Sequence, residues 1–176
     1  MTQTRSVAVC TECDVHWFVD GESAKCAVPG HRHQQFEVHR HRSVVALPGG
    51  TTVVAASFDA DDPYSRDRPP DYGLYFARRW QPPWPHDHVD WPDFGVPDDA
   101  AAMRASLGSV IERAQSGQRV EVGCLGGHGR TGTALACLAV LGGYPADRAV
   151  DWVWANYCRA AVETPRQEAF VAAFPS

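Results

Sequence analysis

A glycine-rich turn between two apolar segments constrains the fold more than any other feature of the chain. Residues 119–123 predict a short strand, and residues 130–141, apolar nearly all round, predict a buried helix. The turn between them, residues 123–132, reads GCLGGHGRTG. Its glycines let the backbone curl until successive N–H groups face one concavity, and the helix that follows adds its positive end. The sequence therefore predicts a strand, an anion-binding turn and a helix in that order.

The rest of the chain alternates between strand-like and helical segments. Further strands are predicted at residues 43–47, 51–57 and 74–76. Further helices are predicted at residues 98–116, from Pro145 to Tyr157 and from Pro165 to about Phe174. Residues 59–70 predict a surface loop, and the prolines at 82, 83 and 85 exclude regular structure there. Strands alternating with helices predict an α/β fold over residues 43–176, with a short mixed sheet flanked by helices.

Composition excludes several broad classes of protein. The 176 residues are 44% hydrophobic and 21% charged, which fits neither a disordered chain nor a fibre. The net charge of −5 gives no general attraction to nucleic acid or to acidic membranes. The longest apolar run, residues 132–143, is too short for a membrane span of about 20 residues, and no apolar leader opens the chain. We therefore expect a cytoplasmic protein with reduced cysteines and neither a membrane nor a nucleic-acid partner.

The turn and a loop upstream of it carry residues suited to phosphoryl transfer. A cysteine at the mouth of an anion-binding turn is favoured as a thiolate, so Cys124 is the candidate nucleophile near neutral pH. Arg130 offers a planar fork for two phosphoryl oxygens. Asp93, in the segment Trp91–Pro97, can donate a proton to the departing oxygen. Phosphate-binding backbone groups are expected at Leu125, Gly126, Gly127, His128 and Gly129, in addition to the Arg130 side chain.

These motifs together resemble the cysteine-dependent protein tyrosine and dual-specificity phosphatase superfamily. The resemblance rests on Cys124-x5-Arg130-Thr131 with glycines at 127 and 129, and on Trp-Pro-Asp-Phe-Gly at residues 91–95. It implies a tyrosine-phosphatase-like fold and a phosphocysteine intermediate on Cys124, with Asp93 as acid and then base. It also implies that Thr131 hydrogen-bonds the sulfur and that Gln167 positions the hydrolytic water. The implied substrate is a phosphorylated protein, on tyrosine or on serine and threonine, and the implied chemistry needs no cofactor.

Two positions depart from the family pattern. Glu163 stands where a first glutamine is expected, and an added negative charge there is expected to slow hydrolysis or shift its pH dependence. Gly123 stands where a histidine usually precedes the nucleophile. We therefore expect a higher thiol pKa than is usual in the family.

Other interpretations of the same residues stay open at this level. A non-catalytic adaptor could bind phosphoprotein through the same turn, and a sulfurtransferase or an arsenate reductase could also use a cysteine in such a loop. His128 could favour anionic substrates when protonated, or it could cap the turn. Cys137 and Cys158, expected inside helices, are interpreted as structural.

Residues 1–42 have a composition of their own and predict a small zinc-ribbon-like module. Cys10, Cys13, Cys26 and His31 can close a tetrahedral zinc site, with His33 as the alternative to His31. A hairpin with its turn at Asp20-Gly21 would separate the ligand pairs, and four protein ligands make such a zinc structural. The alternative is a flexible arm whose cysteines have no role. The basic flank after residue 31 could dock a protein partner or serve as a solvated strand or linker.

Overall fold

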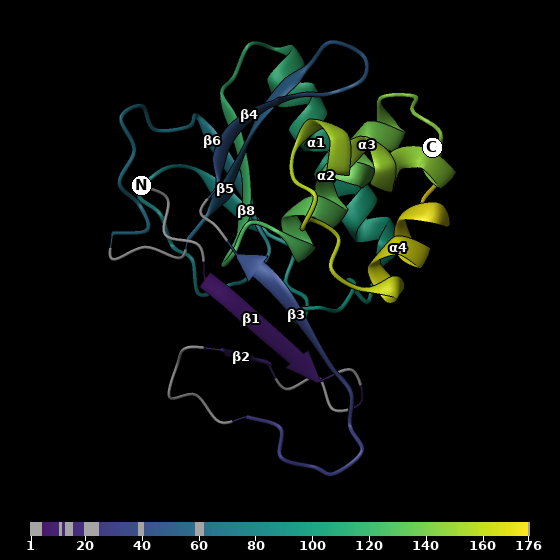
Figure 1. The fold of residues 1–176 in the computed structure, drawn as a ribbon. Helices are drawn as coiled ribbons and strands as arrows, with labels where there is room; N and C mark the ends of the chain where they lie inside the picture. Colours follow the sequence, from purple (N-terminus) through teal and green to yellow (C-terminus); the bar gives the residue numbers. More distant parts are fainter. Residues whose placement is uncertain are drawn as a thin grey trace. The chain divides into compact units, whose positions relative to one another are not determined.

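The computed structural model describes residues 5–10, 12, 16–19, 25–38, 41–58 and 62–175. The chain divides into two compact units, Met1–Arg40 and His41–Ser176, and each is described here by itself (Figure 1). That residues 1–42 act as a separate module stays a prediction.

The larger unit is built on a five-stranded mixed sheet. Its strands are β4 (Arg42–Ala46), β5 (Thr52–Ser57), β6 (Tyr72–Tyr75), β7 (His86–His88) and β8 (Val120–Cys124). Their spatial order is β4-β5-β8-β6-β7, with β4 antiparallel to β5 and every other neighbouring pair parallel. All five residues of the central strand β8 are buried. The mixed sheet predicted from the sequence is confirmed, and β7, which follows Pro85 at the sheet edge, is an addition to it.

Four helices accompany this sheet, to the right of its strands in Figure 1. They are α1 (Ala100–Gln115), α2 (Gly129–Leu141), α3 (Ala149–Asn156), which follows a 3₁₀ turn at Ala146–Arg148, and α4 (Pro165–Ala172). Helix α2 packs against α1, α3, α4 and β8, and only its last residue is not buried. Its apolar sequence is therefore explained by a central position. Within the described residues, no helix combines the length and apolar character that crossing a membrane requires.

Helix caps explain why two of the predicted helices begin where they do. The Asp99 side chain accepts a hydrogen bond from the N–H of Ala102 at 2.9 Å, and α1 starts at the next residue. The Thr164 hydroxyl accepts one from the N–H of Gln167 at 3.2 Å, and Pro165 opens α4. The predicted end of α3 was wrong, because the helix stops at Asn156 and leaves Cys158 outside it.

A buried charged pair anchors the central strand β8, which ends at the candidate nucleophile Cys124. Arg66 donates two hydrogen bonds of 2.8 Å to the carboxylate of Glu121, and both side chains are 2% exposed. The hydroxyl of Tyr75 donates a third hydrogen bond to Glu121 at 3.0 Å. A carboxylate in this position is stable only because its partners replace the lost water. The predicted surface loop before β6, as far as it is described from residue 62, thus contributes Arg66 to the interior.

The smaller unit contains a three-stranded antiparallel sheet in the order β2-β1-β3. Its strands are β1 (Arg5–Cys10), β2 (His16–Phe18) and β3 (His33–Val38). The sequence favoured a strand or linker where β3 lies, and it did not predict β1. The predicted turn at Asp20-Gly21 lies outside the described residues.

Candidate active site

Cys124 is the last residue of the central strand, at the point where β8 enters the glycine-rich turn. Its side chain is 2% exposed, and the hydroxyl of Thr131 donates a hydrogen bond to its sulfur at 3.0 Å. The preceding Gly123 has no room for a larger residue, since an added Cβ would stand 2.8 Å from the carbonyl oxygen of Ala56 on β5. Close strand packing therefore excludes the histidine that usually occupies this position.

The turn itself has the curled backbone that the glycines predict. Gly127 adopts a left-handed conformation with φ of 74°, which a side chain would strain. The hydroxyl of Tyr157 donates a hydrogen bond of 2.5 Å to the Gly127 carbonyl and fixes this part of the turn. The ring of His128 is buried, with Nδ1 2.6 Å from the carbonyl oxygen of Gly126 within the turn, and it makes no capping hydrogen bond to α2. A role of His128 toward anionic substrates stays a prediction.

Arg130, on the first turn of α2, is buried and held by the loops around it. Its Nη1 donates to the carbonyl oxygen of Phe76 at 2.9 Å and approaches that of Trp91 at 3.4 Å, while Nη2 lies 3.2 Å from the Asp93 carboxylate. Its buried Nε has no hydrogen-bond partner among the described residues. A buried guanidinium N–H without an acceptor is costly, and a bound oxyanion would satisfy it.

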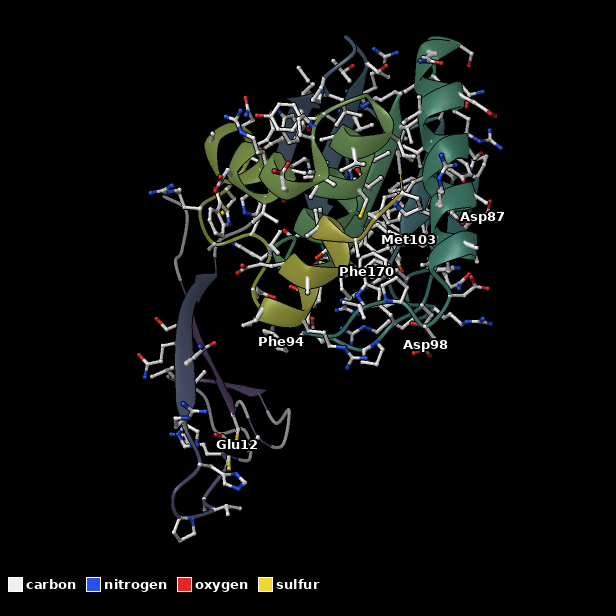
Figure 2. The ribbon with its side chains drawn as sticks, turned by 90° about the vertical axis from the view of Figure 1, so that its right-hand side faces the viewer. Glu12, Asp87, Phe94, Asp98, Met103 and Phe170 are labelled. Atoms are coloured by element: carbon white, nitrogen blue, oxygen red, sulfur yellow. The ribbon has the colours of Figure 1, made fainter. Side chains whose placement is uncertain are left out.

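Asp93 lies in a tight turn whose backbone is tied to the start of α4. Gly95 donates its N–H to the carbonyl oxygen of Pro92 at 3.0 Å, and Phe94 adopts φ of 61°, unusual for a residue with a side chain. The hydroxyl of Thr164 donates to the Phe94 carbonyl at 3.1 Å. Figure 2 shows Phe94 beside the first turn of α4. The Asp93 side chain itself keeps 26% exposure, so it can reach both solvent and the turn.

Burial raises the pKa of the Cys124 thiol above its ordinary value, and the negative charge of Asp93 raises it further. The positive charge of Arg130 and the hydrogen bond from Thr131 act in the opposite direction. The lowered pKa expected from the anion-binding turn is therefore not found in this arrangement. The main physical reason is burial of the thiol, and the Asp93 carboxylate beside Arg130 adds to it.

Glu163 reaches the same turn from the loop before α4. An added Cβ on Gly129 would overlap its carboxylate, which accepts a hydrogen bond from the Gly129 N–H. Burial raises the pKa of Glu163 to about 8, and the nearby charge of Asp93 contributes to this rise. Glu163 is therefore mostly protonated at neutral pH and adds little of the negative charge that the sequence suggested.

Gln167 is fully buried and uses its amide to join two loops. Its Oε1 accepts from the N–H of Glu163 at 2.8 Å, and its Nε2 donates to the carbonyl oxygen of Gly95 at 3.1 Å. The structure thus gives Gln167 a role in holding the Asp93 loop against the start of α4. Its role in positioning water stays a prediction.

The segment that contains the candidate catalytic residues is similar to a known protein family. Residues 88–171 match the family described as "PTP-SAK: Swiss Army Knife protein, DSP-PTPase phosphatase domain". Over these residues the chain is similar to the cysteine-dependent protein tyrosine and dual-specificity phosphatase superfamily. An uncharacterized protein of Methanocaldococcus jannaschii is 39% identical over 84 residues, 48% of this chain and 55% of that protein. The chain spans about half the length of the curated relatives it matches.

Solved structures of phosphatases share the fold of the larger unit. Kinase-associated phosphatase, with its catalytic cysteine replaced by serine, superposes with a TM-score of 0.61 at 14% identity, covering 76% of this chain and 94% of that one. Tk-PTP in its active form superposes with a TM-score of 0.57 at 24% identity, covering 71% of this chain and 91% of that one. At these identities the likeness establishes the fold alone.

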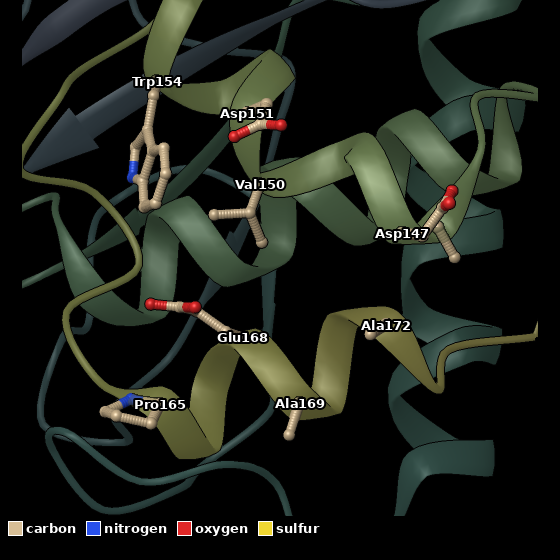
Figure 3. A pocket seen from close by; sticks show the side chains of 9 residues that line it. Asp147, Val150, Asp151, Trp154, Pro165, Glu168, Ala169 and Ala172 are labelled. Atoms are coloured by element: carbon tan, nitrogen blue, oxygen red, sulfur yellow. The ribbon is translucent and has the colours of Figure 1, made fainter.

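A pocket of about 400 Å³ in the larger unit is separate from the candidate active site. It lies between α3 and α4, and Figure 3 shows Asp147, Asp151 and Glu168 among the side chains that line it. None of the predicted catalytic residues lines this pocket.

Within the smaller unit, three of the predicted zinc ligands come together. His31 Nδ1 lies 3.3 Å from the sulfur of Cys10 and 3.5 Å from that of Cys26. Sulfur and nitrogen ligands on one tetrahedral zinc ion stand about 3.6 Å apart, so these three residues fit the ion. The fourth predicted ligand, Cys13, lies outside the described residues. The alternative ligand His33 lies on β3, opposite Cys10, and His31 is the histidine in the cluster.

Proposed function

We propose that residues 41–176 hydrolyse phosphate monoesters as a protein tyrosine or dual-specificity phosphatase. The proposal rests above all on Arg130, whose buried Nε has no partner among the described residues while its charge acts on the Cys124 thiol. Such a guanidinium is suited to a tetrahedral dianion held beside a nucleophile. The family match and the shared fold support the same conclusion.

In the first proposed step, the Cys124 thiolate attacks phosphorus and the bond from phosphorus to the leaving oxygen breaks. Incoming phosphate displaces the Asp93 carboxylate from Arg130, because both anions use the same guanidinium. Asp93 takes up the proton that the Cys124 thiol releases and then donates it to the leaving oxygen. Arg130 and the backbone N–H groups of residues 125–129 stabilise the charge on the phosphoryl oxygens.

In the second proposed step, water attacks the phosphocysteine. Asp93 takes a proton from the water, the S–P bond breaks, and inorganic phosphate leaves. The 3.0 Å hydrogen bond from Thr131 stabilises the sulfur as it becomes a thiolate again. Gln167 keeps the Asp93 loop in place during this step through its bond to Gly95.

The proposed substrate class is a phosphorylated protein, and both phosphotyrosine and phosphoserine or phosphothreonine stay open. The similarity of the fold to that of kinase-associated phosphatase supports this class. Separate turnover assays on phosphotyrosyl and phosphoseryl peptides would distinguish the two kinds of substrate.

Turnover of para-nitrophenyl phosphate in EDTA-containing buffer tests the reaction. We expect wild-type protein to release phosphate and Cys124→Ser to release none. Cys137→Ser is the matched control, since Cys137 is buried in α2 and belongs to no predicted catalytic set; it should keep its activity. If the wild type binds phosphate or vanadate without turnover, the protein acts as a phosphate-binding adaptor and the proposal is wrong.

We also propose that Cys10, Cys13, Cys26 and His31 hold one structural zinc ion. The three described ligands support this through their short distances, and a unit with so small a core needs such a cross-link. Zinc analysis of purified protein should show a loss of zinc in Cys26→Ser relative to wild type. Equal zinc in both proteins would contradict the proposal.

A further inference from the structure

Three buried side chains with metal-binding atoms meet at the anion-binding turn. His41 lies just before β4, His128 just before α2, and Cys158 just after α3. Their donor atoms all lie within 4.8 Å of one another, and all three residues are buried. The cluster includes neither Cys124 nor Asp93, so the proposed reaction does not account for it.

The two imidazoles are oriented as a ligand pair. His128 Nδ1 lies 2.6 Å from a carbonyl oxygen, that of Gly126, and since a carbonyl only accepts, Nδ1 carries the proton. The lone pair of His128 is then on Nε2, which lies 3.1 Å from Nε2 of His41. Two imidazole nitrogens on one tetrahedral zinc ion stand about 3.3 Å apart. A backbone carbonyl that fixes the other ring nitrogen is typical of metal-ligating histidines.

The third donor is the sulfur of Cys158, whose position is fixed by the backbone after α3. It accepts a hydrogen bond from the N–H of Ala160 at 3.3 Å and another from that of Ala161. Burial raises the pKa of this thiol, so binding as a thiolate would require that the metal ion displace the proton. A hydrogen bond between the two histidines would not by itself explain why the sulfur of Cys158 lies within 4.8 Å of their nitrogens.

We propose that His41, His128 and Cys158 form a second metal site, selective for a divalent ion of the zinc class. Two imidazoles and one thiolate are ligands that zinc and cobalt accept, and three protein ligands leave a fourth position for water. A bound ion would join three segments that are distant in sequence, including the anion-binding turn itself. This inference concerns different residues from the N-terminal cluster and does not depend on phosphatase activity.

The first test is a cobalt titration of the full-length chain under reducing conditions. The N-terminal cluster is removed beforehand by the substitutions Cys10→Ser, Cys13→Ser and Cys26→Ser. We expect this triple-serine protein to bind one Co²⁺ per chain, with the visible bands of tetrahedral cobalt and a thiolate-to-cobalt band in the near ultraviolet. Added Zn²⁺ should abolish both signals. Absence of these bands would overturn the proposal.

Further substitutions in the triple-serine protein identify the ligands. Cys158→Ser should lose the thiolate-to-cobalt band, and His41→Gln should lose tetrahedral cobalt. Cys137→Ser, the matched change at another buried thiol, should keep both signals, and so should Cys124→Ser. A band that survives Cys158→Ser, or that disappears in Cys124→Ser, would place the metal elsewhere and refute the site.

X-ray absorption of the zinc-loaded triple-serine protein gives a second answer without changing any proposed ligand. We expect one sulfur at about 2.3 Å and two imidazole nitrogens at about 2.0–2.1 Å from zinc. A shell of nitrogen and oxygen only, or of more than one sulfur, would refute the proposed set. The result does not depend on whether the Cys158→Ser and His41→Gln variants fold.

Discussion

Replacing Glu163 by glutamine tests the environment of the anion-binding turn. Glutamine keeps the size of the side chain and an oxygen that can accept from the Gly129 N–H, but it cannot ionise. In the folded protein burial raises the pKa of Glu163 to about 8, whereas the ordinary value is 4.5. A carboxyl with a raised pKa destabilises the fold once it must ionise, so the wild type has a cost at high pH that the variant lacks.

The size of this effect follows from the two pKa values. Below pH 4.5 the carboxyl is protonated in both states, and Glu163 adds no pH dependence to stability. Between pH 4.5 and 8 only the unfolded chain releases the proton, so the free energy of unfolding falls by about 1.4 kcal/mol per pH unit. From pH 5 to 8 this amounts to about 4 kcal/mol. Since the residue keeps some solvent exposure, which weakens the effect, we expect about 2–4 kcal/mol.

Urea unfolding followed by tryptophan fluorescence at pH 5, 6, 7 and 8 measures this difference, because five of the six tryptophans lie after residue 41. Glu163→Gln should gain stability over wild type steadily as the pH rises. Glu168→Gln, the same change at an exposed position of α4, is the control and should follow the wild type. If wild type and Glu163→Gln stay parallel from pH 5 to 8, Glu163 titrates normally and the reasoning is refuted.

Three further changes have expected outcomes. Asp93→Asn removes a charge that raises the pKa of the Cys124 thiol, so iodoacetamide should inactivate the variant faster than wild type near pH 7, and an equal or slower rate would contradict the pairing. Arg66→Met leaves the Glu121 carboxylate buried without its charged partner, so urea unfolding should show that the free energy of unfolding falls by about 3–5 kcal/mol. A fall below about 1 kcal/mol would mean that water reaches the carboxylate. Gly123→Ala forces a Cβ against the neighbouring strand, and calorimetry should show a lower Tm than wild type; an unchanged Tm would show that the strands separate easily.

The sequence predicted those parts of the site that depend on local spacing. The turn from Cys124 to Arg130 has a strand before it and a helix after it, and both segments are mostly apolar. The prolines and caps that begin α1 and α4 act within a few residues, which is why these helix starts were predicted closely.

The features that sequence reasoning missed depend on contacts between distant segments. No spacing rule brings His41 to His128, 87 positions away, or places Arg66 inside the protein against Glu121. The pKa of Glu163 depends on burial, which a single loop sequence does not show. Periodicity predicts a buried position only inside a helix or strand. His41, Arg66, His128 and Glu163 lie outside such segments, so their burial could not be predicted in this way.

The hydroxyl of Thr164 connects the first turn of α4 to the loop that carries Asp93. Thr164 accepts from the first turn of α4 and donates to the carbonyl of Phe94, while Gln167 bonds to Gly95 next to it. The loop that carries Asp93 therefore cannot swing away without breaking hydrogen bonds to α4 or pulling that helix with it. The same turn of α4 contributes Pro165 and Glu168 to the pocket in Figure 3. A change that shifts this turn of α4 would therefore also shift the loop that carries Asp93, the candidate proton donor, because the same hydrogen bonds join them.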